Sequence, residues 1–294
     1  MKASLSVVIV NYNAGNHLAR CLASLVAHLA GRDWLAVVVD NCSADGSADA
    51  AVDLDPRITL LRNERNVGFG RACNQGVFAT SGALILFLNP DGRLLPGAVD
   101  RLEAELDAHP DCAVIGPAVV NDDGTIQGSG RGDPNMLTGL FGRSTLLTRL
   151  FPRAALARRN VVLEPGPGQG GSSIKVDWVS GSCMLARRSA FEQVGGFDEA
   201  FFLYWEDADL CRRLRHARWQ TRYVPGARVE HSQGRSSLTA PAASIRAFHR
   251  SAYLYYVRHV APSPSNPVRW TAWLVLKLRC WWKLAETELR RARG

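Results

Sequence analysis

The N-terminal third of the chain alternates short apolar runs with segments of helical periodicity. Four runs are continuously apolar and rich in aliphatic or β-branched residues, which is typical of strands buried on both faces of a parallel sheet. These runs are LSVVIV (5–10), LAVVVD (35–40), ITLLRN (58–63) and ALILFLN (83–89). After the first run, leucines at three- and four-residue spacing predict one face of a helix (Leu18, Leu22, Leu25 and Leu29). The alternation predicts a doubly wound α/β domain.

The remaining segments differ in regularity. SADGSADAAVD (43–53) and NVGFGRACNQGVFATSG (66–82) can supply two more crossover helices, and residues 113–127 predict a strand and a turn. Residues 128–175 are dominated by Gly, Pro and Arg and predict a long loop or a mobile lid. Strand, turn and helix patterns resume up to His231. Residues 235–294 predict helices, broken at APSPSNP (261–267), where three prolines prevent a continuous helix.

Composition and charge narrow the class of protein. With 294 residues and 47% hydrophobic side chains, the chain can build a sizeable core. The seven cysteines show no Cys-x-x-Cys pair, and the N-terminal apolar stretch is too short for a signal peptide, so we expect a cytoplasmic protein with structural cysteines. Residues 235–294 hold 11 Lys and Arg against 2 Asp and Glu and account for the net charge of +8. The rest is nearly neutral, so we expect no nucleic-acid partner.

Two common phosphate-binding motifs are excluded. Gly68 and Gly70 invite comparison with a dinucleotide-binding loop, but Cys73 stands at the third glycine position and the segment follows the third strand, not the first. The Gly-Lys-Ser/Thr sequence of a P-loop does not occur. Close packing of a helix on the sheet is the simplest interpretation of these glycines.

Acidic side chains and one histidine stand at the ends of several predicted elements. They are Asp40, Asp91, Glu206, Asp207, Asp209 and His231. Each alone fits a turn, a helix cap or an ordinary strand end. Because the carboxyl ends of neighbouring parallel strands meet at one edge of a sheet, the set together predicts one site. Carboxylates with an imidazole suit Mg²⁺ or Mn²⁺.

Six motifs occur in order between about residue 5 and residue 237: VVIVNYN, VVVDNCSADGS, NVGFGRACNQG, LFLNPD, GSCMLARRSAFEQVGGFDEAFFLYWEDADLCRRLR and VEHSQGRSS. Together they resemble glycosyltransferase family 2, and most closely its rhamnosyltransferase-like branch. The resemblance implies a GT-A fold over residues 1–235, with a nucleotide-sugar half (about 1–125), an acceptor half (about 126–235) and a basic helical tail (236–294). It also implies a nucleotide-sugar donor and a divalent cation.

The resemblance implies roles for individual residues. Asn89-Pro90-Asp91 stands in place of the family's DXD motif, so Asp91 would bind the metal together with His231, while Asn89 replaces the first acid and brings no charge. Asp40 matches the position that reads a pyrimidine base, and Tyr12 the residue that stacks on it. Further nucleotide-side positions are Asn11, Asn66, Arg71 and Asn74.

The segment WEDADLCRR (205–213) resembles the one that carries the catalytic base of the family. We assign the base to Asp207, with Glu206 as the alternative and Asp209 as a structural residue of the helix. In an inverting transfer the acceptor hydroxyl attacks the anomeric carbon from the face opposite the nucleotide. One carboxylate must therefore accept a proton while the metal stabilises the leaving diphosphate. A covalent glycosyl-enzyme is not required.

We therefore expect an inverting transferase that moves L-rhamnose from dTDP-L-rhamnose onto a glycan or lipid-linked glycan of the bacterial envelope. One alternative is a transferase of the same fold with another donor, such as UDP-GlcNAc or UDP-galactofuranose. Another is an inert glycan-binding relative, which only Asn89 favours. A sugar nucleotidyltransferase is disfavoured, because its glycine-rich loop with Arg and Lys is missing after VVIVNYN (7–13).

The tail contains four of the eight tryptophans beside most of the excess cations. Its apolar stretch, interrupted by Lys277 and Arg279, is too short to span a bilayer. On a helical wheel one broad face carries Trp270, Trp273, Leu274, Leu278 and Trp281, and Arg269, Arg279 and Lys283 lie opposite. Such a helix suits a membrane interface, and we expect contact with the inner leaflet of the cell membrane. The alternative is packing on the enzyme's own domain or on a second subunit.

Overall fold

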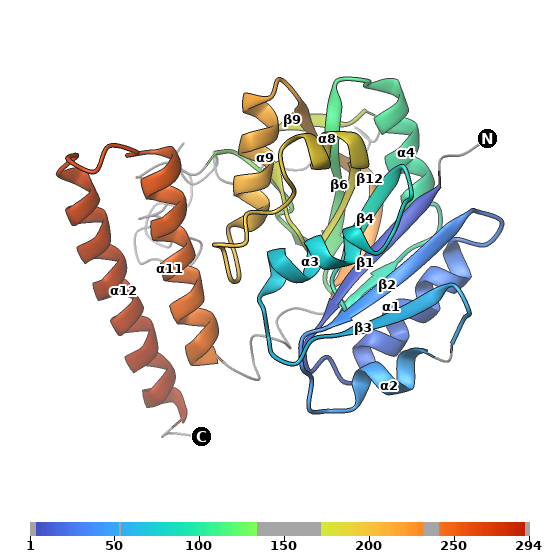
Figure 1. Cartoon of the computed structure of the whole chain (residues 1–294), viewed down its shortest axis with the longest axis horizontal. Coiled ribbons are helices and arrows are strands. Elements are labelled where there is room, and N and C mark those ends of the chain that lie inside the picture. Colours follow the sequence, from blue (N-terminus) through green and yellow to red (C-terminus); the bar gives the residue numbers. More distant parts are fainter. Residues whose placement is uncertain (1–3, 53, 134–171, 232–240, 292–294) are drawn as a thin grey trace.

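The computed structural model describes residues 4–52, 54–133, 172–231 and 241–291. A large mixed β-sheet carries helices on both faces, and two C-terminal helices lie beside it (Figure 1). The predicted α/β architecture with a helical C-terminal appendage is confirmed.

One half of the sheet is parallel and follows the predicted strands. In spatial order these are β3 (Ile58–Arg62), β2 (Trp34–Asp40), β1 (Leu5–Asn11) and β4 (Leu84–Leu88). The connecting helices are α1 (Asn16–His28), α2 (Ser47–Val52) and α3 (Phe69–Phe78). Every residue of β1 and β4 is buried, as continuous apolar runs predict for strands covered on both faces.

The other half of the sheet mixes strand directions. Beyond β4 the order is β11 (Cys183–Arg187), β6 (Cys112–Val120), β12 (Gln220–His231) and β5 (Gly92–Leu94). The short strands β7 (Ile126–Gln127) and β9 (Ile174–Val176) pair with β6 and β12, while β8 (Gly130–Arg131) and β10 (Trp178–Val179) form a separate ribbon. Strand β12 runs parallel to β6 and antiparallel to β5, so a distant part of the chain is brought next to the turn after β4.

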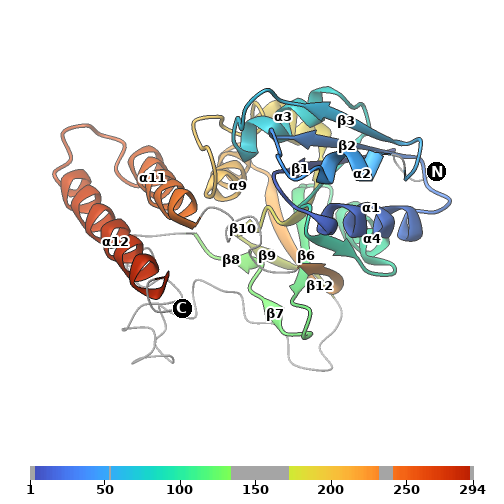
Figure 2. The ribbon, with the colours of Figure 1, turned by 90° about the horizontal axis from the view of Figure 1, so that it is seen from below.

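Helices cover both faces of the sheet (Figure 2), and an apolar cluster lies between the sheet and the helices on each face. On one face, α1 and α4 (Ala98–Ala108) pack against Val7 and Ile9 of β1. On the other, α3, α8 (Arg188–Gln193) and α9 (Glu206–His216) pack against Val8 and Val10. The four predicted leucines of α1 are fully buried, which confirms the helical face inferred from their spacing. All seven cysteines are free thiols.

The predicted helices of the C-terminal segment are also present. They are α11 (Pro241–His259) and α12 (Val268–Arg291), and the break falls at the proline-rich segment 261–267. Of the predicted loop or lid at residues 128–175, residues 134–171 lie outside the described part of the chain. The described ends of that segment form β8 and most of β9, so regular structure extends further into it than the sequence indicated.

Candidate active site

The carboxyl ends of β1 and β2 hold the first pair of predicted site residues. The register places Asn11 directly beside Asp40. The Asn11 Nδ2 group lies within hydrogen-bond distance of three acceptors: Asp40 Oδ1 (2.8 Å) and the hydroxyls of Ser43 (3.0 Å) and Ser47 (2.9 Å). Asp40 Oδ2 accepts the Ser43 N–H (3.1 Å). Asn11 is therefore a buried residue that orients the Asp40 carboxylate.

Hydrogen bonds join the loop that follows β1 to the loop that follows β2. Asn13 donates its backbone N–H to Ser43 Oγ (2.9 Å) and accepts the Ala44 N–H (2.8 Å). Asn13 and Cys42 have positive φ values of 52° and 66°, a left-handed conformation that non-glycine residues adopt only where the surroundings enforce it. Tyr12, the predicted stacking residue, lies between Asn11 and Asn13 and is partly exposed.

The residues predicted from NVGFGRACNQG contact the chain itself. Asn74 accepts the Phe197 N–H and donates to the Phe197 carbonyl, both at 2.9 Å. Arg71 lies 3.5 Å from the Glu199 carboxylate, and Asn66 accepts the Gly68 N–H at 2.9 Å. Asn74 thus holds the segment that leads to α9. The assignment of Asn66, Arg71 and Asn74 to the nucleotide stays a prediction.

The glycines of this motif serve close packing in two places. A Cβ atom on Gly76 would lie 2.5 Å from Val8 Cγ1, so this glycine lets α3 approach β1 closely. A Cβ atom on Gly68 would lie 2.5 Å from the Phe202 carbonyl oxygen, and the Phe69 N–H donates to that same oxygen (2.8 Å). The predicted helix-on-sheet contact therefore belongs to Gly76, whereas Gly68 fits the start of α3 against the segment before α9.

The predicted metal residues meet at the end of β4. His231 Nε2 lies 3.1 Å from Asp91 Oδ1 and 3.1 Å from Asn89 Nδ2. Asp91 is buried, with 7% of its side chain exposed, and His231 is 13% exposed. The pairing of β12 with β5 sets His231 opposite Gly92, next to Asp91, and Gln127 donates to the His231 carbonyl (2.9 Å). Residues far apart in the sequence are therefore fixed in one corner.

This corner supplies only part of a metal shell. Within the described ranges, three or more His, Cys, Asp or Glu side chains do not gather into a metal-binding group. The corner offers one carboxylate, one imidazole and the amide oxygen of Asn89, and the buried His231 Nδ1 has no hydrogen-bond partner among the described residues. Oxygen and imidazole donors of this kind suit Mg²⁺ or Mn²⁺ when other ligands complete the shell.

The predicted catalytic acids open α9. Asp207 Oδ2 accepts the Gly181 N–H (2.9 Å), Oδ1 accepts the Ala208 N–H (2.8 Å), and the residue is partly exposed. Burial raises the pKa of the Asp207 carboxyl, while these N–H groups and the charge of Arg131 lower it. Glu206 is 5% exposed, and its Oε2 has no hydrogen-bond partner among the described residues. Burial, with the charge of Asp207, raises the pKa of Glu206 well above its ordinary value. Asp207 is thus the more accessible and more readily ionised of the two.

A strained turn presents these acids. Tyr204 and Trp205 have positive φ values of 67° and 73°, and neither is a glycine. Two successive left-handed residues persist only where contacts on several sides hold them, and such strain is concentrated at functional sites. The turn ends where Glu206 begins the helix, so its conformation sets the direction in which Asp207 points.

Several groups of the candidate site were not predicted from the sequence. Gly181, two residues before β11, supplies a backbone N–H, and it was not predicted because backbone donors leave no signal in the sequence. Arg131 lies with its guanidinium 4.8 Å from the Trp178 ring, in a segment without a clear periodicity. At the ends of β1 and β2, Ser43 and Ser47 contact the Asn11 side chain and were likewise not among the predicted site residues.

The fold and the family models together define a glycosyltransferase with a GT-A fold. The family model Glycosyl transferase family 2 matches residues 6–195, and the model Glycosyl transferase family group 2 matches residues 167–285. The protein belongs to glycosyl transferase family 2 and is a glycosyltransferase.

Its relatives include two rhamnosyltransferases. The chain is 37% identical to the N-acetylglucosaminyl-diphospho-decaprenol L-rhamnosyltransferase of Mycobacterium tuberculosis, over 98% of its own length and 95% of the relative's. It is 38% identical to Rhamnosyltransferase WbbL of Escherichia coli, over 30% of its own length and 33% of that protein's.

Solved structures share the fold. The mannosyltransferase PcManGT from Pyrobaculum calidifontis, in complex with GDP-Man and Mn²⁺, superposes with a TM-score of 0.60 at 15% identity, covering 100% of this chain and 76% of that one. GalNAc-T7 with UDP, GalNAc and Mn²⁺ gives a TM-score of 0.56 at 17% identity, covering 87% and 50%. At these identities the likeness establishes the GT-A fold alone.

Proposed function

We propose that the protein is an inverting L-rhamnosyltransferase that uses dTDP-L-rhamnose and acts on a lipid-linked GlcNAc acceptor in bacterial envelope synthesis. The observation that carries the proposal is 37% identity over 98% of the chain to an enzyme named for this transfer. The clustering of Asn89, Asp91 and His231 and the accessible Asp207 support it, because such a transfer needs a group that binds the cation and a carboxylate that accepts a proton.

We assign donor recognition to the ends of β1 and β2. The Asp40 carboxylate is held by Asn11 and Ser43, so its free lone pairs keep a fixed direction toward a base. Tyr12 adjoins this pair and offers a ring for stacking. A carboxylate accepts the N3–H of thymine or uracil, which supports a pyrimidine nucleotide.

We assign a divalent cation to the corner of Asn89, Asp91 and His231. Its donor set fits Mg²⁺ or Mn²⁺, with the remaining positions left to diphosphate oxygens, and GT-A structures with Mn²⁺ support this. A bound cation would neutralise charge on the leaving diphosphate. Asn89 makes this corner less anionic than a pair of acids would, so the diphosphate would contribute a larger share of the negative ligand charge.

We assign the catalytic base to Asp207. Its two oxygens are each held by one backbone N–H and keep a further lone pair for the acceptor hydroxyl. Asp207 takes the proton of that hydroxyl as its oxygen attacks the anomeric carbon, and the carbon–oxygen bond to the diphosphate breaks on the opposite face. Glu206 is buried and its raised pKa favours the protonated form, so we assign it no contact with the acceptor.

We retain the proposed domain division, with a nucleotide-sugar half (about 1–125), an acceptor half (about 126–235) and a tail (236–294). The placement of the donor residues at the ends of β1 and β2, and of the catalytic acids on α9, supports the two halves. Contacts between α11 and α9 mean that the first helix of the tail belongs to the packed body of the enzyme.

Donor identity is tested by ligand binding and turnover. We expect dTDP and UDP to raise the melting temperature more than GDP does, and dTDP-L-rhamnose to be consumed with a lipid-linked GlcNAc acceptor. Asp40→Ala is expected to weaken dTDP binding, whereas Asp123→Ala, at an exposed turn, serves as the control. Tighter binding of GDP than of dTDP or UDP would contradict the pyrimidine assignment.

We further propose that α12 rests on the inner face of the cell membrane. A membrane-spanning helix, by length and apolarity, is not found in the described segments. The predicted apolar face of α12 is turned outward, with Trp270 72%, Leu278 59% and Trp281 68% exposed. It therefore does not pack on the enzyme's own domain. Trp side chains are favoured at headgroup depth, and a lipid-linked acceptor requires an active site near the bilayer.

Arg279 and Lys283 lie opposite the outward-facing tryptophans, as on the helical wheel, but the expectation that they contact lipid is not retained. The charges of Arg279 and Lys283 act on His249 of α11 and, after burial, lower the pKa of that imidazole. These two cations thus face α11, not lipid. Lys277 lies 5.6 Å from the Trp273 ring and remains beside the outward face. Lys277, which is exposed, is the cation beside this face that can contact anionic headgroups.

A liposome assay tests the membrane proposal. We expect the full-length protein to co-sediment with anionic vesicles at low salt, and less so at high salt because screening weakens headgroup attraction. The double variant Trp270→Ser, Trp281→Ser is expected to lose most of this binding. Phe78→Ser, which removes another aromatic ring (95% exposed) from α3, is the matched control. Absence of binding to anionic vesicles at low salt would contradict the proposal. A dimer that dissociates in the double Trp variant would instead show that this face packs on a second subunit.

A further inference from the structure

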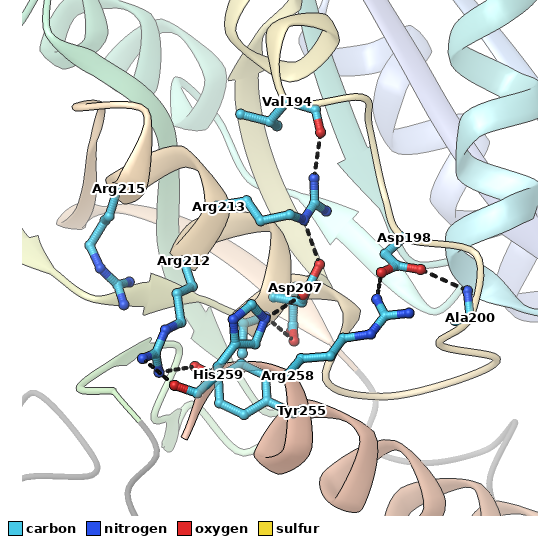
Figure 3. Close-up of polar contacts among 12 residues, drawn as sticks. Val194, Asp198, Ala200, Asp207, Arg212, Arg213, Arg215, Tyr255, Arg258 and His259 are labelled. Atoms are coloured by element: carbon cyan, nitrogen blue, oxygen red, sulfur yellow. Dashed lines mark hydrogen bonds and ion pairs between the residues drawn. The ribbon is translucent and has the colours of Figure 1, made fainter. Parts of the chain in front are cut away.

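Helix α11 packs directly on the helix that carries the catalytic acids (Figure 3). His259 Nε2 lies 2.6 Å from Asp209 Oδ1, and Arg212 of α9 donates to the His259 carbonyl (2.8 Å). Arg258 of α11 pairs with Asp198 in the segment before α9. The residues joined here are about fifty positions apart in the sequence, so the contact is tertiary and fixes α11 against the site.

Asp209 is the residue on which these contacts converge. Its side chain is 1% exposed, and its second oxygen accepts Arg213 Nε at 2.7 Å. Arg213 also donates to the Val194 carbonyl (2.7 Å), which ties α9 to the end of α8. A carboxylate removed from water in this way is stable only if it is paired and hydrogen-bonded. His259 and Arg213 meet that requirement from opposite sides.

The strained turn before α9 is also held by α11. Ser251 Oγ donates to the Leu203 carbonyl at 2.9 Å, one residue before the left-handed pair. The Trp205 ring lies 5.3 Å from the Tyr255 ring and 5.8 Å from the Phe248 ring. Ala208, next to Asp207, packs into the same apolar cluster as Tyr255. Helix α11 therefore contacts both the turn and the helix that together orient Asp207.

We propose that His259 is a positioning residue for the catalytic base: by holding Asp209 it fixes the first turn of α9, and so the direction of Asp207. The proposal rests on the assignment of Asp207 as the base. Asp207 and Asp209 share one helical turn, and without His259 one oxygen of Asp209 would be an unpaired buried acceptor beside two other acids. The turn would relax, and misplacing a catalytic group by about 1 Å can cost on the order of 10²-fold in rate.

Replacement of His259 tests this role. We expect His259→Ala to lower kcat by about 10- to 100-fold, with little change in KM for the donor or in dTDP affinity. His259→Gln keeps an N–H donor for Asp209 and is expected to restore most of kcat. Asp209→Asn, which keeps the side-chain shape, is expected to show the same selective loss. The double variant should lose no more than either single variant, because both remove one interaction.

A second histidine of α11 provides the matched control. His249 is also buried, but its Nδ1–H donates to the Ile245 carbonyl within α11 (2.8 Å), and the charges that act on it are Arg279 and Lys283 of α12. We expect His249→Ala to lower the melting temperature without the selective fall in kcat. A His259→Ala enzyme with normal kcat would overturn the proposal. So would equal losses of kcat in His259→Ala and His249→Ala that parallel the fall in melting temperature. Turnover by Asp207→Asn would instead refute the assignment of the base.

Discussion

Asp207→Asn is expected to lower kcat by about 10²–10⁴-fold, because the amide cannot accept the proton of the acceptor hydroxyl. Donor affinity should barely change, since the residue acts in the chemical step. The amide keeps the shape of the side chain, but its single oxygen can accept the N–H of Gly181 or of Ala208 and not both, because these groups bind different oxygens of Asp207. Single-turnover kinetics with saturating donor measure the effect directly.

Glu206→Gln is the paired control for this variant. Glu206 is buried, and its raised pKa favours the protonated form, so its replacement should cost much less turnover. Because burial also raises the pKa of Asp207, kcat should fall with decreasing pH at a higher pH than an ordinary aspartate would give. Loss of activity in Glu206→Gln alone, with Asp207→Asn active, would move the base to Glu206.

Asp91→Ala is expected to abolish turnover. Its carboxylate is the single acidic group beside His231 and Asn89, and without it the corner keeps no negative protein ligand among the described residues for a cation. Excess chelator should inactivate the wild-type enzyme in the same way, and Mg²⁺ or Mn²⁺ should restore it. Isothermal titration with Mn²⁺ in the presence of dTDP provides the binding readout.

Asp123→Ala is the control for Asp91→Ala. Asp123 lies in the exposed turn between β6 and β7, where it accepts the Thr125 N–H (2.9 Å). We expect this variant to retain turnover and cation dependence. Full activity of the wild-type enzyme in excess chelator would show that the cation assignment is wrong.

The elements of the parallel half could be predicted because their pattern is local. The apolar runs of β1 and β4 and the leucine spacing of α1 record burial, and the structure confirms it. The prediction was wrong for β3, which lies at the edge of the sheet with only Ile58 buried. The mixed half depends on pairing between distant segments. The pairing of Val229 and Glu230 with Leu94 and Arg93 leaves no periodicity in either strand, so β5 could not be predicted.

The candidate site divides in the same way. Asp91 and His231 could be predicted as site residues from the strand ends and the resemblance. In the structure His231 Nε2 lies 3.1 Å from Asp91 Oδ1. The two hydrogen bonds between Asn74 and the Phe197 backbone were not predictable, because an asparagine in a helix has the same local pattern whether it contacts a ligand or a loop. The contact of His259 with Asp209 likewise requires the three-dimensional packing of α11.

The measurement that tests the central claim most directly is the stereochemical outcome of transfer. The purified enzyme is incubated with dTDP-L-rhamnose, Mg²⁺ or Mn²⁺ and a polyprenyl-diphosphate-linked GlcNAc acceptor, and the product is analysed by NMR. The account predicts a rhamnosyl linkage whose anomeric configuration is opposite to that of the donor. A linkage with the donor's configuration would contradict it. So would an enzyme that neither hydrolyses nor transfers rhamnose from dTDP-L-rhamnose but is active with another nucleotide sugar.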